Sequence, residues 1–141
     1  MSSLFVVVAL LIGASAAPAS APSSGPPKTA TAKEGQFEIA LAAAKANTTT
    51  PEGMKFDREV GKHFETHHSS TMETCTRDAV QDDLKEFTLV AKLSGEGAVE
   101  EILVKPGTKV SFCLSGAVAK DRFPKPPKPD YWVFLNMTIS Q

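Results

Sequence analysis

The sequence lacks the signatures of nucleic-acid binding and of several common enzyme classes. Its 141 residues hold 15 Lys and Arg against 16 Asp and Glu, so the formal net charge is -1 and no basic surplus is present to attract a nucleic acid. It has no P-loop, no G-x-G-x-x-G dinucleotide motif and no G-x-S-x-G nucleophile elbow. These absences favour a protein that is not an enzyme, holds no cofactor and binds no nucleic acid.

Long hydrophobic runs are also scarce. The apolar stretch Leu4–Ile12 is followed by the small-residue site Ala14-Ser15-Ala16, although the first residues carry no Lys or Arg. This order is typical of a secretory signal peptide, which we predict at residues 1–16. A retained membrane anchor is the alternative, but a span needs about 20 apolar residues and this run has roughly half of them. We therefore expect a periplasmic or secreted protein without a membrane span after cleavage.

Cysteine occurs only twice, as Cys75 and Cys113. In an oxidising compartment an even number of cysteines usually means pairing, and two cysteines allow a single intramolecular pair. Cys75 ends the apolar stripe of the first long predicted helix, and Cys113 lies in the apolar stripe of the later helix. A bond between them would therefore join two helix faces that are already expected to pack together. We predict a disulfide between them, and two buried free thiols are the alternative.

The mature chain divides into a tail and a body. Residues 17–33 consist almost wholly of Ala, Pro, Ser, Gly and Thr, which predicts a flexible linker because no large apolar side chain offsets the cost of ordering it. In the body, residues 34–141, a short apolar stripe predicts a helix that starts near Phe37 and ends near Asn47. Thr50, followed by Pro51, is a good N-cap for a longer helix ending near Arg77. Its expected buried stripe consists of Phe56, Val60, Phe64, His67, Met72 and Cys75.

The hydrophobic period then changes from helix to strand. Residues 87–93 alternate, Gly95-Glu96-Gly97 supplies a turn, and residues 99–104 return, which predicts a β-hairpin. A stripe from Val110 to Val118 predicts a further helix. The proline- and lysine-rich residues 123–129 are expected to be a rigid extended connection, with a polyproline-type ligand as the alternative. The last strand, residues 131–139, is apolar on both faces and is expected inside a sheet or under a helix. The order is helix, strand, strand, helix, strand, an α+β body.

Several of these pieces resemble the C-terminal domain of TonB-type proteins. They are the L-S-G-E-G-A-V hairpin, I-L-V-K-P-G-T before a helix with Cys113, R-F-P-K-P-P-K-P, and the strand Y-W-V-F-L-N-M-T-I-S. The chain is most similar to small exported TonB-like proteins of Gram-negative bacteria with T-P-E-G, a cysteine ending the first helix and P-P-x-P-x-Y-W-V. The resemblance covers residues 34–141. It implies a three-stranded antiparallel sheet packed by helices, whose edge strand captures an extended peptide.

The chain departs from a TonB energy transducer in two respects, since its N-terminus looks cleavable and its tail has only about 17 residues, which reach about 60 Å at most. A small exported adaptor that binds a protein or peptide, such as a cell-envelope protein, is the favoured function. We expect Trp132 and Phe134, on the face of the last strand opposite Tyr131, and an exposed hairpin edge to contact that partner. A homodimer is an alternative, because an unpaired edge strand can pair with the same strand of a second copy of the chain.

The three histidines, His63, His67 and His68, lie close together in the longer helix. At helical spacing Glu59, His63 and His67 share a face, so a periplasmic metal-binding protein is the alternative function. The string H-F-E-T-H is not the zinc-protease motif H-E-x-x-H, because the glutamate falls one residue late. A polar helix face without metal is the simpler interpretation, and we predict no metal site.

Overall fold

The computed structural model describes residues 29–30 and 34–140. The predicted signal peptide and most of the predicted linker lie outside these residues. The elements in chain order are β1 (Thr29–Ala30), α1 (Glu34–Asn47), α2 (Pro51–Thr76), the 3-10 turn η1 (Gln81–Asp83), β2 (Phe87–Leu93), β3 (Val99–Lys105), α3 (Lys109–Val118) and β4 (Tyr131–Met137). This order confirms the predicted α+β class.

The sheet has the strand order β1-β3-β2-β4, and its three long strands are antiparallel. Leu89 of β2 lies opposite Val104 on one side and Leu135 on the other. The expectation of an exposed hairpin edge is wrong at two positions, because the short β1 pairs in parallel with Ile102 and Leu103 of β3. Both residues of β1 come from the segment expected to be a linker. The other outer strand of the sheet is β4.

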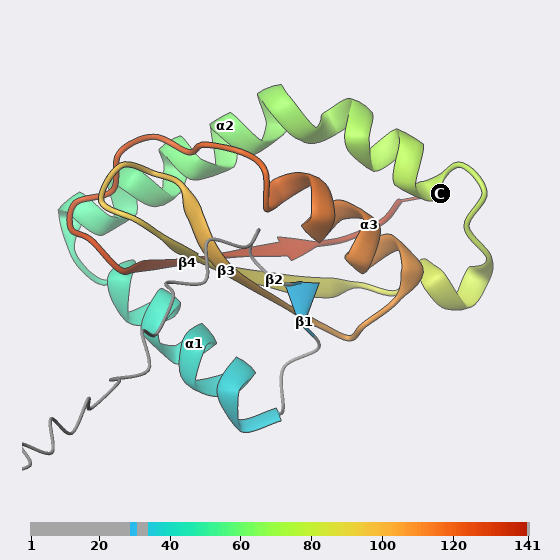
Figure 1. Ribbon diagram of the computed structural model, residues 1–141, viewed down its shortest axis with the longest axis horizontal. Coiled ribbons are helices and arrows are strands. Elements are labelled where there is room, and N and C mark those ends of the chain that lie inside the picture. The colour runs from blue at the N-terminus through green and yellow to red at the C-terminus, as the bar shows by residue number, and fades with distance from the viewer. Residues whose placement is uncertain (1–28, 31–33, 141) are drawn as a thin grey trace, which may run out of the picture.

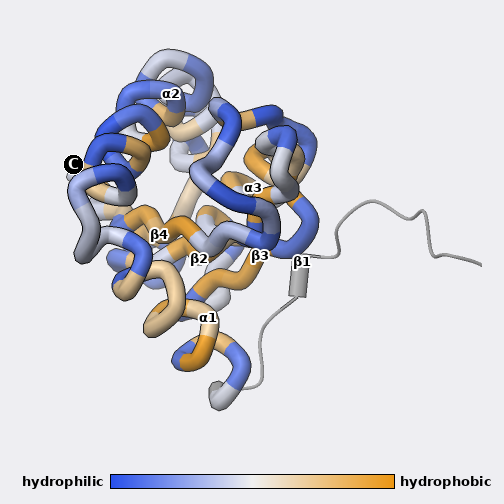
Figure 2. Tube along the Cα trace, turned by 90° about the vertical axis from the view of Figure 1, so that its left-hand side faces the viewer, coloured by the Kyte–Doolittle hydropathy of each residue, from blue (hydrophilic) through white to orange (hydrophobic). Residues whose placement is uncertain are grey.

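Helices cover both faces of the sheet (Figure 1). On one face α2 and α3 lie side by side over a large apolar cluster, and on the other face α1 lies alone over a small one. The strands form a hydrophobic layer between the helices, and the outer side of α2 is polar (Figure 2). The small cluster consists of Phe37, Ala40, Ala44, Val90 and Leu103. The large one includes Phe56, Val60, Phe64, Leu89, Leu93, Ile102, Leu114 and Tyr131. The strand β4 is thus apolar on both faces because it lies between helices, although it is an edge strand.

The start of α2 is fixed by the local sequence. Thr50 is extended, and its hydroxyl accepts the N–H of Gly53 at 3.0 Å, while Pro51 occupies the first helical turn as predicted. A Cβ on Gly53 would lie 1.7 Å from the carbonyl oxygen of Asn47 at the end of α1. Only glycine therefore allows α1 and α2 to meet this closely.

The histidines of α2 are arranged differently from the prediction. His67 was expected on the buried stripe, but it is exposed, and His68 is buried with 5% of its surface accessible. The reason is the helical repeat, because Phe56, Val60 and Phe64 continue at the next fourth residue, which is position 68. In the described part of the chain, none of the helices has the length and hydropathy needed to cross a bilayer.

Candidate interaction site

The outer edge of β4 offers unpaired main-chain groups. The side-chain amide of Asn47, at the end of α1, donates to the carbonyl of Trp132 at 2.9 Å, which indicates that this carbonyl faces away from β2. Main-chain groups alternate between the two sides of an antiparallel strand, so those of Phe134 and Asn136 face outward as well. Within residues 34–140, no hydrogen bond reaches this outer side of β4 beyond Trp132. The outward carbonyl of Trp132 is thus bonded to Asn47, whereas the outward main-chain groups of Phe134 and Asn136 have no partner in the described residues. We call the latter stretch the open edge of β4.

The two predicted partner-contacting residues lie on the α1 face of the sheet. Trp132 and Phe134 are half-buried and pack against the small cluster under α1, while Tyr131 is buried on the opposite face, 5.2 Å from the ring of Phe56. The Nζ of Lys92 lies 5.8 Å from the Trp132 ring. Each ring thus packs partly against the cluster under α1. The rest of each ring is exposed beside the open edge of β4.

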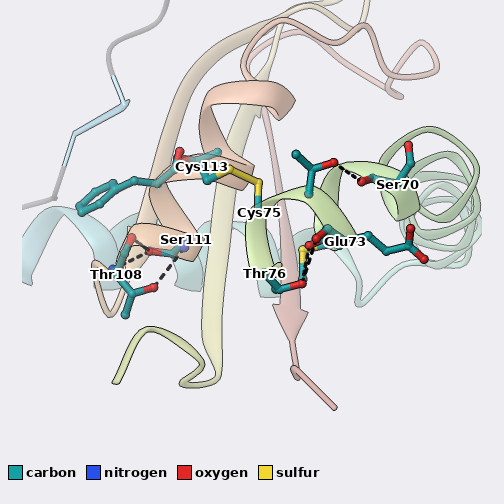
Figure 3. The surroundings of a disulfide bond; sticks show 11 residues. Ser70, Glu73, Cys75, Thr76, Thr108, Ser111 and Cys113 are labelled. Carbon is teal, nitrogen blue, oxygen red and sulfur yellow. Dashed lines mark hydrogen bonds between the residues drawn. A yellow bond between two sulfur atoms is a disulfide. The ribbon is translucent and has the colours of Figure 1, made fainter. Parts of the chain in front are cut away.

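Cys75 and Cys113 form the predicted disulfide (Figure 3). It joins the last turn of α2 to the middle of α3, with the two Cα atoms 5.7 Å apart. The hydroxyl of Ser111, two residues before Cys113, accepts the N–H of Thr108 while the Thr108 hydroxyl accepts the N–H of Ser111. This reciprocal capping box fixes the start of α3. The covalent link therefore connects two helices that already have well-defined ends.

Two histidines of α2 share one carboxylate. The Nε2 atoms of His63 and His68 lie 2.8 and 2.6 Å from the same oxygen, Oδ2 of Asp121. An ionised carboxylate only accepts hydrogen bonds, so both imidazoles carry a proton on Nε2 and donate it. Oδ1 accepts the N–H of Arg122 at 2.7 Å. This arrangement ties the middle of α2 to the segment that follows α3.

The same contacts set the charge state of Asp121. Burial by itself raises the pKa of the Asp121 carboxyl, but the hydrogen bonds from His68, His63 and the Arg122 N–H outweigh burial and lower the pKa below its ordinary value. The buried Nδ1 of His68 has no hydrogen-bond partner in the described residues. Asp121 is therefore an ionised anchor at neutral pH.

The residues of the metal hypothesis come together only in part. The rings of His63 and His67 stack with their centroids 4.2 Å apart, and Glu59 lines the same surface hollow. However, Nε2 of His63 is engaged by Asp121. In the described part of the chain, no three His, Cys, Asp or Glu side chains are placed to hold a metal ion.

The sequence interpretation missed two residues of this region. Asp121 lies 58 and 53 positions after its histidine partners, and a carboxylate just after a helix gives no local signal of so distant a contact. Asn47 was expected only as the end of a helix, whereas its side chain also closes the start of the β4 edge.

Comparison with known protein families, curated proteins and solved structures found no match to this chain.

Proposed function

We propose that this chain is a small exported binding module, not an enzyme, that holds an extended segment of a protein partner along the open edge of β4. The observation that carries the proposal is the outward side of β4 beyond Trp132, where the main-chain groups of Phe134 and Asn136 have no partner in the described residues. An extended peptide that pairs with such an edge gains main-chain hydrogen bonds, and neighbouring side chains select its sequence.

The two outer strands differ in a way that supports this choice. The edge of β3 is occupied by β1 at Ile102 and Leu103, whereas β4 is closed only at Trp132 by Asn47. The half-exposed rings of Trp132 and Phe134 flank the open part, and aromatic rings supply much of the binding energy at protein interfaces. The resemblance to TonB-type domains, which capture extended peptides at a sheet edge, points to the same surface.

Export is the second part of the proposal. A disulfide between Cys75 and Cys113 persists in an oxidising compartment such as the periplasm or the extracellular space. The resemblance to exported TonB-like proteins of Gram-negative bacteria and the predicted signal peptide favour the same location.

The surroundings of the histidines bear on one class of enzyme mechanism, nucleophilic catalysis by a hydroxyl or thiol. When Ser, Thr or Cys is the nucleophile, its hydroxyl or thiol is hydrogen-bonded to a general base. In the described part of the chain, no hydroxyl or thiol is bonded to His63 or His68, and both cysteines are oxidised. The arrangement supports an anchoring role for Asp121.

The test is a matched pair of variants at Asn136, an exposed residue of β4. Asn136→Pro removes the outward N–H and is tolerated on an edge strand, whereas Asn136→Thr retains the N–H and favours a strand. Phage-displayed peptides are selected on the wild-type protein, and their affinities are measured by calorimetry. We expect Asn136→Pro to bind the selected peptides at least tenfold more weakly and Asn136→Thr to bind them within about twofold.

Two results would contradict this function. Peptides that bind Asn136→Pro as tightly as the wild type would place their site elsewhere. Sedimentation of the wild type as a dimer that Asn136→Pro dissociates would show that a second copy, rather than a peptide partner, covers the edge.

A further inference from the structure

A groove runs along α2 on the side that faces the connection between α3 and β4. Three consecutive hollows of about 430, 340 and 310 Å³ make up this groove. The first two share Glu52 and Pro127 as lining residues, and the last two share Glu59. The groove therefore extends from the start of α2 at Thr50 to His67, which is about 25 Å at 1.5 Å per helical residue. That length accommodates about eight residues of an extended peptide.

The wall opposite α2 is held rigidly in place. The N–H of Phe123 donates to the carbonyl of Gly97 at 2.9 Å, and Gly97 has a φ of 87°. A Cβ on Gly97 would lie 2.1 Å from the Phe123 carbonyl oxygen, so the contact requires glycine. Pro126 is buried, and Asp121 anchors the beginning of the segment to α2. A groove that is formed before its ligand arrives loses less entropy on binding.

Unpaired positive charge lines both walls. Lys55 and Lys62 project from α2, and Lys125 and Lys128 from the connection. All four are exposed, and none forms an ion pair within residues 34–140. With Glu52 and Glu59 counted, the lining carries a net charge of +2 when the histidines are neutral, whereas the whole chain carries -1. The groove is therefore a cationic strip on a slightly acidic protein.

We propose that this groove binds an extended acidic peptide segment, with the four lysines contacting its carboxylates. Charge complementarity identifies the sign of the ligand. At the floor of the groove, Phe56 and Tyr131 are each only 4% exposed and offer a ligand little surface, so the class of the ligand follows from the pattern of charges on the walls. Glu52 and Glu59 would repel a continuous polyanion, whereas a peptide can place neutral residues beside them.

This site is separate from the β4 edge. Phe134 and Asn136 of the open edge do not line the groove, which touches β4 only at Tyr131. Burial raises the pKa of the Tyr131 hydroxyl, and the charges of Asp57 and Glu52 raise it further, so this side chain adds no negative charge to the floor. A partner with an acidic segment beside a strand-forming one would engage both surfaces, but neither site requires the other.

The test uses the full chain with its disulfide formed and a fluorescein-labelled nonapeptide of alternating Glu and Val. We expect saturable binding in fluorescence anisotropy, weakened by raising NaCl from 50 to 300 mM. The double variant Lys125→Glu/Lys128→Glu should bind about tenfold more weakly. The control Lys85→Glu/Lys109→Glu makes the same change of charge at exposed lysines outside the groove and should stay within about twofold.

Several outcomes would overturn the inference. They are no saturable binding, equal losses in the groove and control variants, or equal affinity for a peptide with Gln in place of Glu. Inorganic polyphosphate that binds the same lysines more tightly than the peptide would assign the groove to a polyanion instead. Asn136→Pro should leave this binding unchanged, so the result is independent of the proposed β4 function.

Discussion

The two faces of the sheet are built by different means. The face under α2 and α3 buries sixteen residues, many of them large, and its helices are joined by a disulfide and by the Asp121 anchor. The face under α1 buries five residues, two of which are alanines, and its helix is held by apolar packing, the Asn47 amide and an exposed Lys105–Glu38 pair. Buried area and cross-links are thus concentrated on one face. This face provides most of the stability, while α1 is an added layer beside the proposed binding edge.

The largest effect should come from removing the covalent link between α2 and α3. The double variant Cys75→Ser/Cys113→Ser loses a cross-link with a sequence separation of 38 residues. The greater chain entropy of the unfolded state should lower the free energy of unfolding by about 4 kcal/mol. Urea denaturation of the variant and of the reduced wild type should give the same decrease.

Hydrogen exchange would show whether the difference between the faces is real. In the wild type we expect amides of α1 to exchange through openings of lower free energy than amides of α2 near Val60. Without the disulfide the protection of α2 should fall while that of α1 changes little, so the two helices would become more alike. A decrease of unfolding free energy below about 1 kcal/mol, or equal losses in both helices, would contradict this view.

Gly53 lies where the two layers meet, and changing it tests whether α1 depends on α2. In Gly53→Ala the new methyl group would overlap the Asn47 carbonyl, so α1 and α2 must separate. We expect a loss of about 3 kcal/mol in the free energy of unfolding, as in other overpacked sites. The measurement is thermal unfolding followed by circular dichroism.

The matched control for Gly53→Ala lies in the same helix. A Cβ on Gly61 meets nothing within 4 Å, so Gly61→Ala should gain about 1 kcal/mol from helix propensity alone. Opposite signs at the two glycines would confirm that the close contact, rather than helix propensity, determines the result. A loss of stability in both variants would instead indicate that α2 tolerates no change.

These glycines also illustrate what local patterns can and cannot predict. The alternation in residues 87–93, the stripe from Val110 to Val118 and the Thr50 cap each reflect an interaction within a few residues, and all three elements were predicted correctly. The need for glycine at position 53 depends on how α1 crosses α2, which no local pattern contains.

The candidate sites show the same limit more strongly. The opposite faces of Tyr131 and Trp132 follow from strand alternation and were foreseen. The Asn47 contact with β4 and the pairing of β1 with β3 join residues more than 70 positions apart. The prediction placed His67 rather than His68 on the buried side of α2. It counted every third or fourth residue as equally buried, although one turn of an α-helix has about 3.6 residues.

The smallest expected loss of stability concerns the Asp121 anchor and depends on pH. The folded-state pKa of Asp121 lies below its ordinary value of 3.8, so the ionised carboxylate stabilises the fold fully above that value. This contribution is lost as the pH falls through the lower, folded-state pKa. Asp121→Asn should cost about 2 kcal/mol at pH 7, because His63 and His68 lose a charged acceptor.

The pH dependence separates this anchor from the other carboxylates of the chain. The difference in unfolding free energy between wild type and Asp121→Asn should shrink from its value at pH 7 as the pH falls below about 4. Asp78→Asn, at an exposed carboxylate after α2, should show no such convergence with the wild type. Because Asp121 faces His63 and His68 of α2 and the Arg122 N–H, the acid-induced loss should appear in the exchange of α2 amides before those of α1. Loss of α1 protection first would mean that α1, rather than α2, depends on the anchor, and the contrast between the faces would have to be reversed.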